Sequence, residues 1–154
     1  MTIPPDDRMA ELRTLFFESA GELVQTLNDQ ALQLEHSPGH AEIIRGMRRT
    51  VHTLKGDSAA CSFRELSELA HEFEDVLSLE KAAAAASVPE IALRAADLFA
   101  AMLAAYREKK KLPATQALRQ EIARLARSSA TDSAGTKRSK SKPAAFRWSE
   151  YEQL

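Results

Sequence analysis

Three residues in the run VHTLKG are suited to chemistry: His52, Lys55 and Gly56. Residues three and four positions apart share one face of a helix, so these three lie within about one turn of each other. The Lys55 ammonium can therefore reach an anion carried by the imidazole. A glycine inside a helix is less favourable than alanine by roughly 0.5–1 kcal/mol, and its presence here suggests that a partner approaches the backbone closely. The pattern predicts a phosphorylated histidine at 52 with a docking surface at Gly56.

A second polar pair, His71 and Glu74, lies in the next segment of helical periodicity. If the two helices pack antiparallel, the Glu74 carboxylate can accept a hydrogen bond from one ring nitrogen of His52. That bond would fix the tautomer and make the other nitrogen the better nucleophile. Each residue alone has a structural explanation, because single polar side chains are common beside helix cores. The combination with Lys55 and Gly56 is what indicates a phosphoacceptor.

At these residues the chain resembles the histidine phosphotransfer (HPt) domain, and within it the N-terminal phosphoacceptor domain of CheA-type chemotaxis histidine kinases. The similar segments are LFFESA at 15–20, VHTLKG at 51–56 and ELAHEFEDVL at 68–77, and the resemblance covers roughly residues 8–127. The resemblance implies that His52 takes the phosphoryl group and that Glu74 hydrogen-bonds the ring. It also implies that Lys55 and His71 complete the polar cluster. Asp57 departs from the family, in which a glycine or a small residue is common at this position.

Composition favours an all-α protein. The chain has 154 residues, of which 44% are hydrophobic and only 6% aromatic, which suits a helical bundle built from Leu and Ala. We predict an antiparallel up-down four-helix bundle with an additional C-terminal helix. The single cysteine, Cys61, lies on an apolar stripe and offers no disulfide framework. With no long apolar run and no secretory signal, we expect a cytoplasmic protein without membrane insertion.

Apolar residues that recur at steps of three and four predict the helices. A first helix starts after residues 5–7, a second carries His52 and ends near Cys61, and a capping box at 62–65 starts the third. The alanine run at 82–86 prolongs the third helix, a second capping box at 87–90 starts the fourth, and a shorter fifth follows Pro113. The expected inward-facing residues of the first three helices are Met9, Leu12, Phe16, Ala20, Leu23, Leu27, Ala31 and Leu34; Ile44, Met47, Val51, Leu54, Ser58 and Cys61; and Phe63, Leu66, Leu69, Ala70, Phe73, Val76 and Leu77.

The bundle is predicted to occupy residues 1–127. Residues 128–145 are rich in Ser, Thr, Ala, Gly, Lys and Pro and are expected to form a flexible linker. Residues 146–154 become aromatic again and indicate the start of a truncated downstream segment, as in an N-terminal fragment of a longer protein. The basic cluster at 137–142 has no interleaved aromatic residues and no DNA-reading motif, so we expect no nucleic-acid partner.

The sequence contains no phosphate-binding glycine loop and no ATP-domain pattern. We therefore expect no metal or other cofactor in this chain, with ATP and Mg²⁺ carried by partner domains. The expected mechanism is that of a carrier, in which a separate histidine kinase catalytic domain delivers the γ-phosphoryl of ATP to His52. An aspartate of a response regulator receiver domain then takes it. Lys55 is expected to offset part of the new negative charge.

Three alternatives remain open. A free-standing phosphorelay intermediate would use the same residues but would receive its phosphoryl group from another receiver, and sequence beyond Leu154 would decide this. A metal-binding bundle would use His52, His71 and Glu74 as ligands, although Lys55 at the mouth opposes a cation. An inert docking module that has lost phosphorylation is the third, and the intact His-Lys-Gly triplet argues against it. The sequence does not identify the cognate receiver, the sensory input or the oligomeric state.

Overall fold

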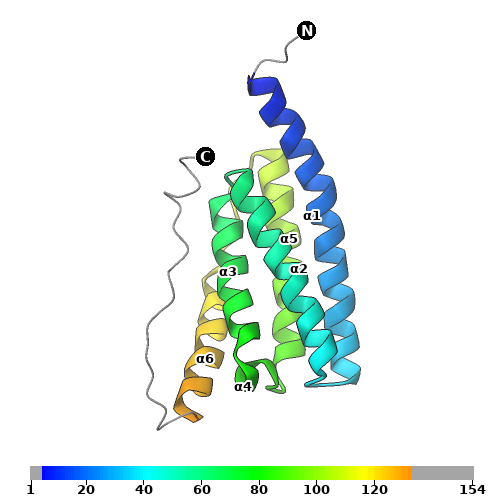
Figure 1. Cartoon of the computed structure of the whole chain (residues 1–154). Coiled ribbons are helices and arrows are strands. Elements are labelled where there is room, and N and C mark those ends of the chain that lie inside the picture. The colour runs from blue at the N-terminus through cyan, green and yellow to red at the C-terminus, as the bar shows by residue number, and fades with distance from the viewer. Residues whose placement is uncertain (1–4, 133–154) are drawn as a thin grey trace.

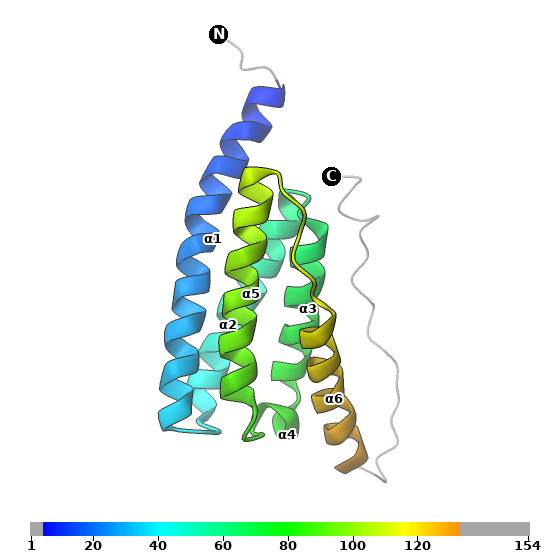
Figure 2. The same ribbon diagram turned by 180° about the vertical axis from the view of Figure 1, so that it is seen from behind.

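The computed structural model describes residues 5–132, and every regular element in them is a helix (Figure 1). The helices are α1 (Pro5–His36), α2 (Ala41–Ala60), α3 (Arg64–Ser78), α4 (Glu80–Ala83), α5 (Val88–Glu108) and α6 (Gln116–Asp132). The four long helices α1, α2, α3 and α5 run up and down beside one another. From behind, an extended connection leads from the end of α5 along α3 to α6, which lies against the outside of the bundle (Figure 2). The prediction of an all-α bundle is confirmed.

The core forms where the apolar stripes of these helices meet. All of the inward-facing residues expected in α2 and α3 are buried, as are Phe16, Ala20, Leu27, Ala31 and Leu34 of α1. Met9 and Leu12, which were expected to face inward, are instead 37% and 52% exposed. The reason is visible in Figure 1, where the first turns of α1 project beyond the ends of the neighbouring helices and so have nothing to pack against.

The connection between α2 and α3 is tight, but the predicted capping box is wrong. Ser62 adopts a left-handed conformation with φ of 66°, and α3 begins without a side-chain capping bond. The Phe63 N–H instead donates to the Ser58 carbonyl at 2.8 Å, which closes the end of α2. The Phe63 ring then packs on Tyr106, with ring centroids 4.3 Å apart. Packing and a backbone bond therefore fix this turn, and they leave α2 and α3 as antiparallel neighbours.

The second expected capping box, at 87–90, does mark the start of a helix, but the expected side-chain hydrogen bond does not form. α5 begins after Ser87, whose side chain makes no capping hydrogen bond. The alanine run does not prolong α3, because Leu79 takes an extended conformation (φ −86°, ψ 112°) and separates α3 from the short helix α4. Ala82 and Ala83 of α4 are buried, so burial of small side chains positions this segment.

α6 packs on the side of the bundle as expected, with Leu118, Ile122 and Leu125 buried. Arg119 contributes ion pairs to Glu68 and Glu72 of α3, with N–O distances of 3.8 and 3.7 Å. The helix continues to Asp132, so the expected linker at 128–145 begins inside a helix. The rest of that linker, the basic cluster and the segment 146–154 lie outside the described residues.

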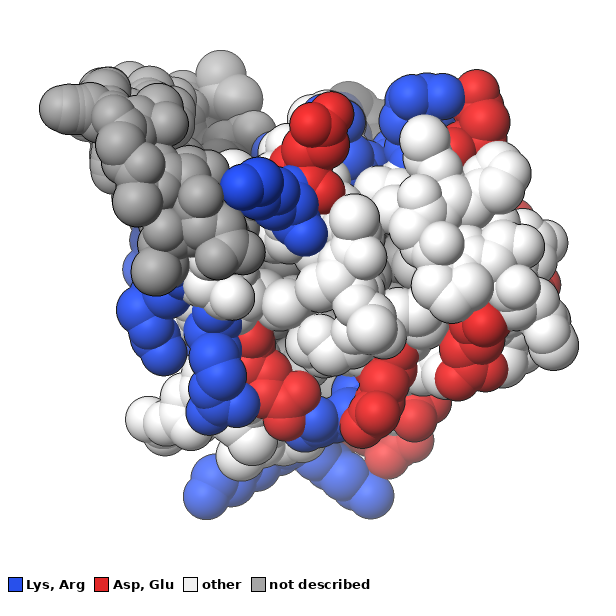
Figure 3. Space-filling view, turned by 90° about the horizontal axis from the view of Figure 1, so that it is seen from below, with Lys and Arg blue, Asp and Glu red and all other residues white. Residues whose placement is uncertain are grey.

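Charged side chains surround an uncharged centre at one end of the bundle (Figure 3). Figure 3 shows the end near the α1–α2 connection and α4, where uncharged side chains fill the centre and Lys, Arg, Asp and Glu lie around the edge. Within residues 5–132, no helix combines the length and the apolar character that crossing a bilayer requires.

Candidate functional site

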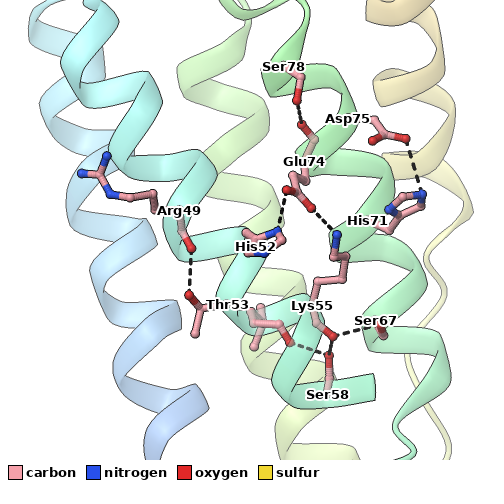
Figure 4. A network of polar contacts seen from close by, with 11 residues as sticks. Arg49, His52, Thr53, Lys55, Ser58, Ser67, His71, Glu74, Asp75 and Ser78 are labelled. Atoms are coloured by element: carbon pink, nitrogen blue, oxygen red, sulfur yellow. Dashed lines mark hydrogen bonds and ion pairs between the residues drawn. The ribbon is translucent and has the colours of Figure 1, made fainter. Parts of the chain in front are cut away.

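His52 projects from α2 toward α3, and its side chain is 64% exposed. Its Nδ1 lies 2.8 Å from Oε2 of Glu74, as the sequence predicted for this pair (Figure 4). An ionised carboxylate only accepts hydrogen bonds, so Nδ1 carries a proton, and in the neutral ring Nε2 then keeps its lone pair. The contact therefore favours the tautomer in which Nε2 of the exposed ring is unprotonated.

Glu74 is held between two donors. Lys55 Nζ lies 2.7 Å from Oε1 while His52 occupies Oε2. Burial alone raises the carboxyl pKa, but the hydrogen bonds from Lys55 and His52, together with the positive charge of Lys55, outweigh burial and hold the pKa of Glu74 below its usual range. Glu74 is thus ionised at neutral pH.

Two buried serines donate to backbone carbonyls beside the site, and one of them links α3 to α2. Ser67 Oγ of α3 donates to the Lys55 carbonyl of α2 at 3.0 Å, and Ser58 Oγ donates to the Leu54 carbonyl at 2.6 Å and to the Lys55 carbonyl at 3.2 Å (Figure 4). Both serines are fully buried. Because the bond from Ser67 joins α3 to α2, it fixes the position of Lys55 and His52 along the helix axis relative to Glu74. Sequence reasoning does not identify Ser67, although a polar residue on the buried face of α3 is a signal that it needs a partner.

The polar cluster expected from the resemblance is only partly assembled. His52, Lys55 and Glu74 are in contact, whereas His71 Nε2 lies 3.5 Å from Asp75 Oδ2, one turn along its own helix. In Figure 4 the His71 ring is directed toward Asp75 and not toward His52. The structure therefore places His71 beside the cluster.

The metal-binding alternative is not supported by this geometry. Across residues 5–132, no three His, Cys, Asp or Glu side chains are grouped closely enough to hold a metal ion. The Lys55 ammonium also occupies one oxygen of Glu74, where a cation would have to bind.

Gly56 lies next to the site at a partly exposed position of α2. A Cβ atom on it would meet nothing within 4 Å apart from its sequence neighbours and the adjacent backbone of its own helix. The position therefore has open space in front of it, which a docking surface requires.

Sequence reasoning missed three arginines beside His52. Arg45, Arg48 and Arg49 line an open hollow of about 560 Å³ together with His52, Thr53 and Glu74. The signal was present in the spacing, because positions three, four and seven residues before His52 lie on the same side of a helix.

Comparison with known proteins agrees with this arrangement. Residues 11–128 match the Hpt domain family. The chain belongs to the Hpt domain family. The match covers all of α2 and α3, so it includes every residue of the cluster around His52.

The curated relatives of this Hpt domain include chemotaxis proteins named CheA and a sensor histidine kinase named CheAY. It is 43% identical over 63 residues to the chemotaxis protein CheA of Listeria monocytogenes, an alignment that covers 41% of this chain and 10% of that protein. It is 30% identical over 105 residues to the sensor histidine kinase CheAY of Helicobacter pylori, covering 66% and 13%. With CheA of Bacillus subtilis it shares 35% identity over 69 residues, covering 45% and 10%. The matched region spans about a tenth of the length of these relatives.

The low pKa of Glu74 predicts a specific dependence of stability on pH. Because folding lowers the pKa from its ordinary value of 4.5, ionised Glu74 stabilises the folded state above that pH, and this contribution is lost as the pH falls through the folded-state pKa. Glu74→Gln removes the titrating group. We expect the stability advantage of wild type over Glu74→Gln to decrease as the pH falls below about 5. Denaturant unfolding at a series of pH values measures this, and a difference that stays constant into acid would contradict it.

Proposed function

We propose that this Hpt domain carries a phosphoryl group on His52 between the catalytic domain of a chemotaxis histidine kinase and an aspartate of a response regulator. The observation that supports this most directly is the hydrogen bond from Nδ1 to Glu74, which leaves Nε2 as a nucleophile on an exposed ring. The similarity to CheA proteins supports the chemotaxis setting, and with it a cytoplasmic location.

The proposed reaction has two displacements at phosphorus. The Nε2 lone pair attacks the γ-phosphorus of ATP, the bond to the bridging oxygen breaks, and ADP leaves with the electron pair. A carboxylate oxygen of the receiver aspartate then attacks the same phosphorus, and the electrons of the N–P bond return to Nε2. Both steps depend on in-line approach and charge neutralisation, for which the partner domains supply ATP and Mg²⁺.

Glu74 and Lys55 have separate parts in this proposal. Phosphorylation at Nε2 makes the ring more positive while Nδ1 keeps its proton, and the Glu74 carboxylate stabilises that charge. Lys55 is only 16% exposed and is already bound to Glu74, so its part is to hold the carboxylate in place. This differs from the sequence expectation that Lys55 offsets the phosphoryl charge directly.

A two-step transfer assay tests the proposed function. The chain is incubated with the catalytic domain of a CheA protein and γ-labelled ATP, and a receiver domain is then added to the purified product. We expect label that survives alkali and is lost in acid, followed by its departure when the receiver is present. Absence of label on the wild-type chain from both this donor and a phosphorylated receiver would overturn the proposal and favour the inert docking module. Label that arrives only from a phosphorylated receiver would favour the free-standing phosphorelay intermediate.

Bulk at Gly56 should harm transfer more than folding. Glycine to alanine inside a helix stabilises by up to roughly 1 kcal/mol, and the open space at this position accepts a Cβ atom. Gly56→Ala serves as the matched control for Gly56→Leu, whose larger side chain should block the approach of a receiver to His52 one turn away. We expect both variants to fold and only Gly56→Leu to lose phosphoryl groups slowly to the receiver. Equal transfer rates for Gly56→Leu and wild type would mean that the receiver docks on another side.

A further inference from the structure

The hollow beside His52 is lined by Arg45, Arg48 and Arg49, which have no role in the proposed reaction as described above. Arg45 pairs with Glu42, with an N–O distance of 2.7 Å. Arg48 and Arg49 are exposed, and neither guanidinium makes a hydrogen bond or an ion pair with another residue in the range 5–132. Two guanidinium groups with no direct hydrogen bond or ion pair to another described residue therefore flank the proposed phosphoacceptor, although Arg49 lies close enough to Glu42 to lower its carboxyl pKa further, after the larger effect of Arg45.

The other charges near His52 are already balanced. Glu74 accepts from both His52 and Lys55, and Lys55 is largely covered. An anion that approaches Nε2 therefore finds no further cation in the cluster itself. The positive charge available to it comes from the arginines on the exposed side of α2.

The spacing places these guanidinium groups within reach of the ring. Arg48 and Arg49 precede His52 by four and three residues, which is one helical turn. In Figure 4 the Arg49 side chain extends from α2 away from Glu74, so it must turn about its exposed stem to meet a group on His52. A guanidinium offers paired N–H donors that match the oxygens of a phosphate group.

We propose that Arg48 and Arg49, with Arg45 next to them, form an oxyanion site that binds phosphate groups as they reach or leave Nε2 of His52. This inference rests on the proposed function. The bound oxygens belong either to the phosphoryl group once it is attached to His52 or to the polyphosphate of the ATP that donates it. The chemistry is the same in both cases, and kinetics separate the two sources.

The test compares two double variants of the full chain. Arg48→Gln with Arg49→Gln removes the proposed site, and Lys111→Gln with Arg124→Gln removes the same number of positive charges from exposed positions away from it. Phosphorylation by a CheA catalytic domain is followed as a function of ATP concentration. The lifetime of the purified phosphorylated chain without partners is measured separately. Circular dichroism melting checks that each variant folds as the wild type does.

We expect the arginine variant to show a decrease of about tenfold or more in the phosphorylation rate, in the lifetime of the phosphorylated chain, or in both, which is the scale of losing charge-assisted hydrogen bonds. The control variant should stay near wild type in both measurements. Slower phosphorylation with an unchanged lifetime assigns the site to ATP. A shorter lifetime assigns it to the attached phosphoryl group. Wild-type behaviour in both arms overturns the inference but leaves the proposed function standing, because the wild-type chain still becomes labelled. An equal decrease of rate or lifetime in both double variants would show a general effect of charge. Weaker binding of the arginine variant to the catalytic domain in the absence of ATP would show that the arginines contact the protein. Either result overturns the phosphate site.

Discussion

Replacing His52 by glutamine is expected to abolish phosphorylation of this chain altogether. The ring supplies the only nucleophilic nitrogen in the described structure that is both exposed and held in a defined tautomer by a carboxylate at 2.8 Å. Glutamine keeps a polar side chain of similar reach but has no lone pair on nitrogen that can attack phosphorus. Incubation with a CheA catalytic domain and γ-labelled ATP, followed by acid and alkali treatment, measures the loss.

The other three histidines provide matched controls for this prediction. His36 and His40 lie near the α1–α2 connection, and His71 lies against Asp75. His36→Gln, His40→Gln and His71→Gln should each retain acid-labile label. Label that persists in His52→Gln, and disappears on changing one of the other three, would defeat the assignment of His52.

The apolar pattern of the sequence was sufficient to predict the helices that carry the site. The stripes of α2 and α3 have helical period throughout, and every residue assigned to them is buried. Such a pattern determines which face turns inward, so it also determined that His52 and Glu74 would flank a shared interface. The contact between their side chains was predictable because the turn between the helices is too short for any arrangement other than antiparallel.

The ends of the helices and the hydrogen-bond partners of the polar side chains were less predictable. A Ser-x-x-Glu pattern favours a capping box, but at Ser62 the packing of Phe63 on Tyr106 and the bond to the Ser58 carbonyl produced a different turn. Leu12 has the right spacing for a core residue, yet only the three-dimensional arrangement shows that the start of α1 extends beyond the neighbouring helices (Figure 1). The engagement of Lys55 by Glu74 likewise depends on side-chain geometry, which spacing along the chain does not encode.

Removing Glu74 is expected to slow phosphorylation of His52 by something on the order of 10²-fold or more, the scale typical of general acid–base assistance. Without the carboxylate, Nδ1 has no acceptor, so the ring loses both its preferred tautomer and the anion that stabilises its developing positive charge. Glu74→Ala should still fold, because the core residues of α3 do not involve this side chain. The measurement is the initial rate of labelling at saturating ATP.

Glu74→Ala also leaves the largely covered ammonium of Lys55 without its carboxylate partner. Glu74→Ala combined with Lys55→Ala removes this unpaired charge and should remain as slow as Glu74→Ala, since the lost function is that of the carboxylate. Asp75→Ala is the control on the same helix, because Asp75 contacts His71 rather than His52, and it should be phosphorylated at close to the wild-type rate. If Glu74→Ala reacts as fast as wild type with an unchanged melting temperature, another group orients the ring, and His71→Ala then becomes the variant in which the rate must fall.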